Sequence, residues 1–334
     1  MATENNVKEK RPLGVSVHHL CTTFQPEAML YASKRLASDF STKIRICDME
    51  NFIFDKGEHY RSIEDNKMKS SYVDSLDGKD HVGYANYMLS YSRENTINDI
   101  VNALVGFCKS QRLSLKRTYV WIWCLCANQH RIKEQINRGK SLPFDQSNFE
   151  EKIIGIKNIL SLMVPWNAPI NLNRVWCLYE TYTAIEKNCN LTMIMPPTEK
   201  EKLMCAIMTA GAYNLLEVLS RTKIEDAEAS QQEDKENIIN LVNSGPGTSA
   251  VNGKIHDRLK EWIGEAMVET AKAAESNAQD VVRNVDLAIL YNGIGRVYNE
   301  KGNYEIALKY HMKCLKIVQE VYGSNHPKKS LHIQ

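Results

Sequence analysis

A carboxylate and an aromatic side chain in the sequence are spaced so that they can serve one binding cleft. Glu180 follows Trp176 by four residues, and helix residues at this spacing lie on one face. A carboxylate held beside an aromatic wall can stabilise the positive charge of an oxocarbenium-like state as a glycosidic bond breaks. Ser90, Tyr91 and Arg93 close an apolar, strand-like run and would border the same cleft. These residues form the candidate site in the first part of the chain.

The same region also has a purely structural interpretation. In RVWCLYE (174–180), Trp176 and Cys177 suit a helix that packs its apolar face against a sheet. A glutamate one helical turn later would then be solvated or ion-paired. Both interpretations, a catalytic carboxylate and a packing helix, remain open from the sequence.

Most other chemistries lack their motifs. The sequence contains no G-x-x-x-x-G-K-[ST] phosphate loop, no G-x-G-x-x-G dinucleotide turn and no G-x-S-x-G elbow. NTPases, Rossmann dehydrogenases and α/β-hydrolases are therefore disfavoured. The nine cysteines have no zinc-like spacing, so we expect reduced thiols and neither a metal nor a bound cofactor.

The elements that would position the site follow from hydrophobic patterning. Between residues 84 and 221, short apolar runs alternate with amphipathic helical segments, as in βαβ units. The predicted strands are 86–91, 119–124, 158–163 and 191–195, and the predicted helices are 96–109, 149–156 and 174–187. Right-handed crossovers bring the carboxyl ends of such strands to one edge, where ligands bind. We therefore predict an α/β fold with a doubly wound, flavodoxin-like parallel sheet.

The first 80 residues have a different pattern. Residues 13–19 and 43–54 alternate like strands, 27–39 are helix-like, and 56–79 are polar and loop-like. We expect this N-terminal extension to add edge strands to the sheet or to form a small lid.

Composition and charge exclude several classes of protein. The 334 residues carry 42 Lys and Arg against 40 Asp and Glu, a formal net charge of +2, which indicates neither nucleic acid nor an anionic membrane as partner. No apolar run approaches the ~20 residues of a membrane span, and the N-terminus lacks the apolar core of a signal peptide. We expect a soluble, cytoplasmic protein.

The last third of the chain is predicted to be helical. Helical patterns cover 232–242 and 255–274, with a Gly-Pro-Gly turn at 245–247 between them. In 286–322, small and aromatic residues recur at spacings that build a helix-turn-helix hairpin. They are Tyr291, Ile294, Gly295, Tyr298, Gly302, Ala307, Leu308, Cys314 and Leu315.

This hairpin resembles a tetratricopeptide repeat of the longer type found in kinesin light chains, whose GSNHP linker appears at 323–327. His311 departs from the pattern, because a large apolar residue usually occupies its position. The resemblance implies that Asn292, Arg296 and Asn299 lie on the concave side, where they would bind an extended peptide or its carboxylate. The alternative is a solvated helix face.

A single repeat is too short to bury a continuous core, which takes about three copies. Residues 255–280 would act as a degenerate neighbour and cap, or the array is truncated, or the open face pairs in a dimer. The sequence leaves these three alternatives open.

The α/β segment resembles a TIR domain over residues 84–210. NYMLSYSREN (86–95) matches an apolar strand that ends in Leu/Ile-Ser-Tyr/Phe-Arg, and RVWCLYE (174–180) matches the Trp-Cys-Leu-x-Glu helix of plant-type TIR domains. Two further segments extend the resemblance, YVWIWCLCANQH (119–130) and VPWNAP (164–169). The whole arrangement is similar to uncharacterised algal proteins that join a TIR-like domain to kinesin-light-chain-type repeats.

The resemblance implies two different functions. In TIR domains that cleave NAD the matching glutamate is catalytic, which carries that role to Glu180, with NAD as substrate. Many other TIR domains self-associate as scaffolds without catalysis. The chain departs from the TIR pattern in its long loop at 128–143, and in Trp121 and Trp123, which stand where the second strand usually carries an acidic residue.

These observations predict a chain of several parts. The predicted boundaries are an N-terminal extension 1–80, a TIR-like α/β domain 81–245, a helical linker or cap 246–284 and a hairpin of an incomplete repeat array 285–334. We predict a signalling scaffold or adaptor whose TIR-like domain self-associates and whose repeat binds a protein partner. The alternative is an enzyme, an NAD glycohydrolase with Glu180 as its catalytic carboxylate.

Overall fold

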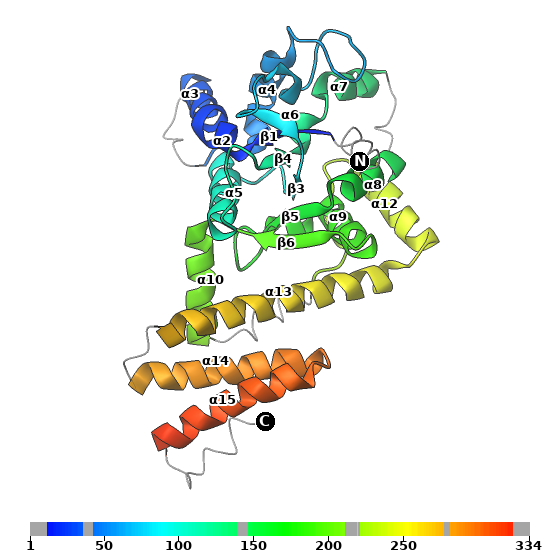
Figure 1. Ribbon diagram of the computed structural model, residues 1–334. Helices are drawn as coiled ribbons and strands as arrows, with labels where there is room; N and C mark the ends of the chain where they lie inside the picture. The colour runs from blue at the N-terminus through cyan, green and yellow to red at the C-terminus, as the bar shows by residue number, and fades with distance from the viewer. Residues whose placement is uncertain are drawn as a thin grey trace, which may run out of the picture. The chain divides into compact units, whose positions relative to one another are not determined.

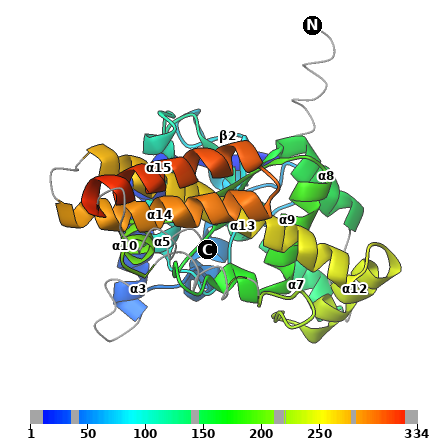
Figure 2. The same ribbon diagram turned by 90° about the horizontal axis from the view of Figure 1, so that it is seen from below.

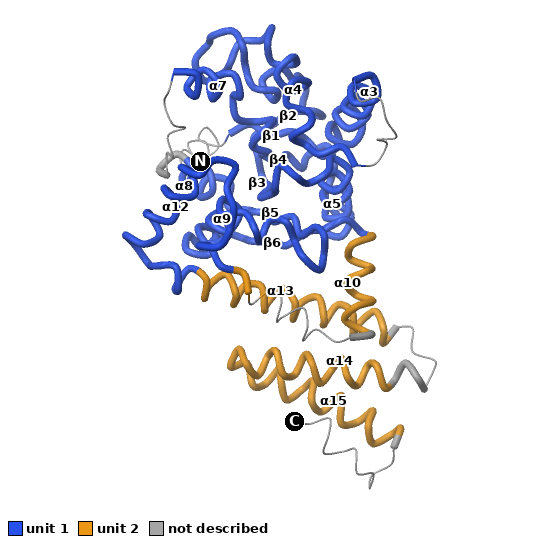
Figure 3. The backbone as a smooth tube through the Cα atoms, turned by 180° about the vertical axis from the view of Figure 1, so that it is seen from behind, with its two compact units in different colours: residues 1–197, 223–251 blue, residues 198–222, 252–334 orange. Residues whose placement is uncertain are grey.

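The computed structural model places the chain in two compact units (Figure 3). The α/β unit comprises Met1–Pro197 and Lys223–Val251, and the helical unit comprises Thr198–Thr222 and Asn252–Gln334. The residues that the structure describes are 12–35, 43–138, 146–210, 219, 221–276 and 281–322. The predicted boundaries at residues 80, 245 and 284 stay a prediction. Within the described ranges, no helix combines the length and the apolar character that a membrane crossing requires.

The described part of the α/β unit contains one mixed sheet with the strand order β2-β1-β4-β3-β5-β6. The strands are β1 (Leu13–Ser16), β2 (Val82–Tyr84), β3 (Tyr87–Ser90), β4 (Tyr119–Trp121), β5 (Asn158–Leu162) and β6 (Asn190–Ile194). The last four are mutually parallel, and β1 is antiparallel to both β2 and β4. Counted along the chain, the parallel strands lie in the order second, first, third, fourth, as in a flavodoxin-like sheet. The predicted α/β class is confirmed.

Both faces of the sheet are covered, which explains why its strands are almost continuously apolar. On one face, Leu89 and Leu160 belong to the core that includes helix α5 (Ile97–Ser110). On the other face, Met88 and Ile159 pack with residues of α8 (Gln146–Ile156) and α9 (Val175–Glu186). Neighbouring strand residues thus alternate between two cores, as the two-residue period of a strand dictates.

The start of α5 is determined locally. The Thr96 hydroxyl accepts a hydrogen bond from the Asp99 amide at 3.0 Å and donates one to the Asp99 carboxylate at 2.7 Å. This N-cap satisfies a backbone donor that the first helical turn leaves free. Ile97, Ile100 and Leu104 then point into the core at helical spacing. The helix that this spacing predicted is therefore present.

The prediction of a second strand in the N-terminal extension is wrong. Residues 43–54 contain a 3₁₀ turn, η2 (Ile46–Met49), followed by helix α4 (Glu50–Gly57). Ile46, Met49 and Ile53 are buried, and their spacing of three and four residues is that of a helix face. Apolar residues in this segment satisfy both periods, and packing selects the helical one.

The first predicted strand is shorter than expected. β1 ends at Ser16, whose hydroxyl accepts a hydrogen bond from the His19 amide at 2.9 Å and so starts α2 (Val17–His19). A π-helical turn, η1 (Leu20–Phe24), and helix α3 (Gln25–Arg35) follow. β1 lies between β2 and β4, so the extension does contribute a strand to the sheet. The predicted loop region after α4 is irregular apart from one 3₁₀ turn, η3 (Val73–Ser75).

The remaining elements of the α/β unit are short helices and turns that follow the parallel strands, and a longer helix near α9 (Figure 1). They are α6 (Trp123–Cys126) and α7 (Gln129–Asn137) after β4, the turn η4 (Ile170–Asn173) after β5, and α12 (Gln232–Ser244). The predicted strand 119–124 therefore ends earlier than expected, because the chain turns into α6.

The helical unit is built around a hairpin. It holds most of α10 (Pro197–Ala210) and α13 (Thr248–Ser276), together with α14 (Val281–Glu300) and α15 (Tyr304–Tyr322). Figures 1 and 2 show α14 and α15 side by side. Gly302 has a φ of +73° in the turn between them, a conformation that glycine adopts without strain.

Glycines set the close approaches between these helices. A Cβ placed on Gly293 would lie 2.7 Å from Met267 of α13, and one on Gly295 would lie 2.6 Å from His311 of α15. The histidine that departs from the repeat pattern is therefore accommodated by the missing side chain opposite it. Helix α13 therefore packs on α14. Its role as a degenerate neighbour and cap of the repeat stays a prediction.

Candidate functional site

The candidate site lies where the order of the parallel strands reverses. The chain leaves β3 for β4 on one side and then crosses to β5 on the other side of β3. Open α/β sheets bind ligands outside the carboxyl ends of the strands at this switch point. Ser90 is the last residue of β3, and it is in register with Ser161 of β5.

Two buried polar residues meet at this point. The Asn171 side-chain amide donates a hydrogen bond to the Ser90 carbonyl at 2.9 Å, and both residues are 1 % exposed. The Ser90 hydroxyl and the Asn171 Oδ1 atom have no hydrogen-bond partner of good geometry in the described chain. Buried polar atoms are nearly always paired, so two unpaired ones on residues that are joined by a hydrogen bond mark the site as unusual. Their chemistry suits the hydroxyl groups of a polar ligand.

Glu180 of α9 faces the same serine. The Ser90 hydroxyl lies close enough to lower the pKa of both the Glu180 carboxyl and the Cys177 thiol, although it makes no well-aligned hydrogen bond to either. Burial has the larger effect and raises the pKa of Glu180 to about 7. Near neutral pH the carboxyl is therefore divided between its charged and neutral forms. Carboxyls with such shifted pKa values gather at functional sites.

Tyr91 is turned toward β4 and α6. Its hydroxyl accepts a hydrogen bond from the Cys124 amide at 3.3 Å, and its carbonyl accepts one from the Cys177 thiol at 3.4 Å. Burial raises the pKa of Tyr91 well above its usual value. Tyr91 thus orders the backbone beside the site.

Arg93 is held by the N-terminal extension. Its guanidinium forms an ion pair with Glu50 of α4, and its carbonyl accepts a hydrogen bond from the Cys47 amide at 3.3 Å. Asn95 nearby accepts a backbone hydrogen bond from Ile46 at 3.0 Å. The extension therefore pins the loop that follows β3.

Trp176 shares α9 with Glu180 but packs on different elements. Its indole NH donates to the Asp234 carboxylate of α12 at 3.3 Å, and its ring meets Phe149 of α8 edge-on at 5.8 Å. The structure thus brings Ser90 and Glu180 together and gives Arg93 and Trp176 structural partners. The ligand-binding roles of Ser90, Tyr91, Arg93 and Trp176 stay a prediction.

Sequence reasoning missed Asn171. The residue lies in η4 after the third parallel strand, at the edge where ligands of such sheets bind. A polar residue in the loop after a buried strand is the signal that could have identified it.

The thiols beside the candidate site are held in their neutral form by burial. All nine cysteines are free, and burial raises the pKa of Cys177 far above the ordinary value and that of Cys124 to about 11. Thiols in such surroundings are poor nucleophiles. Among the described residues there is no group of three or more metal-ligating side chains.

The residues predicted to bind a peptide share one face of α14. Arg296 and Asn299 are exposed and Asn292 is half-buried, on the side turned away from the contacts that Gly293 makes with α13 and Gly295 makes with α15. The face is therefore accessible in the structure. Binding of a peptide by these side chains stays a prediction.

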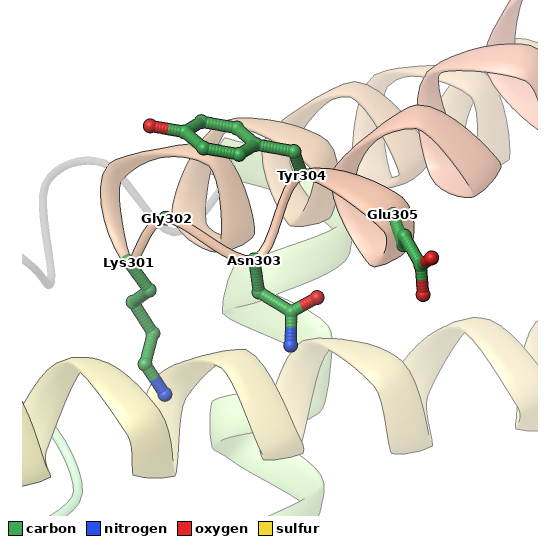
Figure 4. Close-up of a pocket in the computed structure, with 5 residues that line it drawn as sticks. All are labelled: Lys301, Gly302, Asn303, Tyr304 and Glu305. Carbon is green, nitrogen blue, oxygen red and sulfur yellow. The ribbon is translucent and has the colours of Figure 1, made fainter.

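A shallow depression lies at the turn between α14 and α15, lined by residues 301–305 (Figure 4). Lys301 donates a hydrogen bond to the Glu261 carboxylate of α13 at 2.8 Å, while Tyr304 points away from that helix. The depression is open and contains none of the predicted site residues. The contact between Lys301 and Glu261 ties the turn to α13.

Comparison with known families identifies the hairpin. Residues 286–332 match the tetratricopeptide repeat model, a segment that covers most of α14 and all of α15. The predicted repeat is confirmed, and its GSNHP linker lies outside the described residues. Comparisons with curated proteins and with solved structures gave no match. The TIR-like, kinesin-light-chain-like and algal resemblances stay predictions.

Proposed function

We propose that the protein is a cytoplasmic signalling scaffold. Its tetratricopeptide repeat binds a protein partner, and its TIR-like α/β unit assembles with further copies. The observation that supports this proposal is a repeat of a protein-binding class that exposes a polar face on its first helix. The formal net charge of +2 suits a partner chosen by local contacts rather than by long-range attraction.

The peptide would lie extended along α14. Asn292 and Asn299 offer amide groups that can bind a peptide backbone, and Arg296 between them can bind a terminal or side-chain carboxylate. Because a guanidinium makes paired hydrogen bonds to a carboxylate, Arg296 would supply most of the selectivity.

An array of peptides with free or amidated C-termini, probed with the full chain, tests this function. Peptides that bind the wild type should bind Arg296→Ala with about tenfold lower affinity, because one charged hydrogen bond is lost. Lys309→Ala on α15 is the matched control and should bind normally. Equal binding by all three proteins would exclude the α14 face as the binding site.

Hydrolysis of NAD is the second candidate function. It is supported by Glu180, which faces the Ser90 hydroxyl, and by the unpaired Ser90 hydroxyl and Asn171 Oδ1 atom at the switch point. The nicotinamide–ribose bond would break with its electron pair leaving on the nicotinamide nitrogen. Ionised Glu180 would stabilise the ribosyl cation. Water then adds to the sugar carbon and its proton leaves to solvent. Ser90 and Asn171 would position the ribose hydroxyls.

Release of nicotinamide from NAD measures this activity. Glu180→Gln should lower turnover at least about 100-fold, because the charge that stabilises the cation is removed. Glu186→Gln, on the exposed end of the same helix, is the control and should keep full turnover. An absence of turnover in the wild type, or turnover that survives Glu180→Gln, would leave the scaffold as the function.

A further inference from the structure

The outer side of α15 carries a stripe of exposed apolar side chains. Tyr304, Leu308 and Met312 are 69 %, 62 % and 62 % exposed, and they follow one another at intervals of four residues. At this spacing they form one continuous ridge along the helix. We call these three residues the α15 stripe.

The stripe is not the core face of the helix. Ala307, Cys314 and Val318 fill that role, since they are 3 to 6 % exposed. Tetratricopeptide hairpins have two apolar sides because each repeat stacks between neighbours. Helix α13 covers the α14 side of this hairpin through Met267 against Gly293. The α15 stripe is the corresponding stacking face on the other side, and the described part of the chain leaves it open.

We propose that the α15 stripe packs against the same stripe of a second copy of the chain, antiparallel and about a two-fold axis at Leu308. In this register Leu308 meets Leu308 of the second copy, and Tyr304 meets Met312 twice. Each contact is favourable, because aliphatic side chains bury each other and a thioether packs well on an aromatic ring. The three-residue stripe is thus complementary to itself when one copy is reversed.

The charges beside the stripe favour the antiparallel direction. Glu305 and Lys309 flank it, and neither forms an ion pair within the described chain. Reversal about Leu308 brings Glu305 of one copy within about one helical turn of Lys309 of the other, twice by symmetry.

The expected contact is weak. Three side chains from each copy bury much less than the roughly 800 Å² per partner of a stable complex. A dissociation constant of about 10 to 100 µM is therefore expected, and the dimer should form and dissociate with protein concentration.

Sedimentation of the full chain over a concentration series tests the proposal. The wild type should pass from monomer to dimer, and Leu308→Glu should weaken the dimer at least tenfold by placing two carboxylates at the axis. Ile289→Glu is the matched control, because Ile289 is a 45 % exposed apolar residue on α14 outside the stripe. Circular dichroism of each variant establishes that it is folded.

The register is tested by oxidative cross-linking. Leu308→Cys in a Cys205→Ser background should form a disulfide-linked dimer, and Ile289→Cys in the same background should not. A monomer at every concentration, or no cross-link through Leu308→Cys, would overturn the proposal. A dimer that Leu308→Glu leaves intact would also overturn it, and would instead support self-association through the α/β unit.

Discussion

Glu180 is a residue whose charge is disfavoured by its own surroundings. Burial raises its pKa to about 7, from 4.5 in the absence of that burial. Between pH 4.5 and about 7, the Glu180 carboxyl therefore keeps its proton in the folded protein and loses it in the unfolded chain. The stabilisation that goes with this proton is complete below pH 4.5 and is lost as pH rises through about 7. Residues that lower stability in this way are often retained for function.

We predict that Glu180→Gln stabilises the α/β unit at about pH 8 by about 1 to 3 kcal/mol, because the charge of this half-buried, desolvated carboxyl is replaced by a neutral amide. Near pH 4.5 the difference should vanish. Urea unfolding at both pH values measures it, with Glu186→Gln as the control. Destabilisation by Glu180→Gln at the higher pH would contradict the desolvation of this carboxyl.

His19 produces the opposite pH dependence. It is 4 % exposed, and its Nδ1 and Nε2 atoms lie 3.0 Å from His81 Nδ1 and 2.9 Å from the Tyr72 hydroxyl. Burial, and then the neighbouring His81, lower the pKa of His19 from 6.5 to about 4. The unfolded chain therefore takes up a proton first as pH falls. The stabilisation is complete above pH 6.5 and is lost as pH falls toward about 4.

We predict that His19→Gln removes up to about 3 kcal/mol of this pH-dependent stability. The slope of unfolding free energy against pH between about 6.5 and 4 should become flatter than in the wild type. His18→Gln is the matched control, since the His18 side chain makes no hydrogen bond within the described residues. An unchanged slope in His19→Gln would show that the His19 imidazole of the wild type takes up its proton as readily in the folded protein as in the unfolded chain.

At the scale of elements, the sequence predicted helices and strands best where the apolar residues follow only one period, that of a strand or that of a helix. The four parallel strands and α5, α8 and α9 are all present because their apolar residues satisfy only a strand run or only a helix face. Residues 43–54 satisfy both periods, and contacts with the loop after β3 determine the result. Local pattern alone does not contain those contacts.

The candidate site divides in the same way. The meeting of Ser90 and Glu180 follows from a strand end and a helix that lie at the same sheet edge, so it was predictable. Arg93 binds Glu50 and Trp176 binds Asp234, partners that are 43 and 58 residues away in sequence. Tertiary folding brings those pairs together, and no short spacing indicates them.

The crossing of α14 and α15 depends on a matched pair, a glycine facing a histidine. Gly295→Ala would place its Cβ 2.6 Å from His311. We predict that it destabilises the helical unit by about 1 kcal/mol, although alanine is the better helix former. In a His311→Ala background the same change should stabilise the unit, because only the helix propensity remains. Thermal unfolding of the four proteins of this cycle gives the coupling, and additive effects would exclude the contact.

At the scale of the whole molecule, the two units have separate buried cores. The α/β core lies around the sheet, and the helical core includes Trp262, which is 6 % exposed, with Ile263 and Ile294. The α/β unit is assembled from two segments of chain, so its stability depends on Lys223–Val251 as well as on the sheet. Units with separate cores unfold with separate free energies unless their interface is large.

We predict two unfolding transitions in denaturant, which tryptophan fluorescence can assign. Of the five tryptophans, Trp262 alone belongs to the helical unit. Trp262→Phe should remove the fluorescence change of one transition while circular dichroism still detects both. Gly295→Ala should move that transition and leave the other, and Glu180→Gln should do the reverse. If every variant instead shifts a single transition seen by both probes, the two units fold as one cooperative structure.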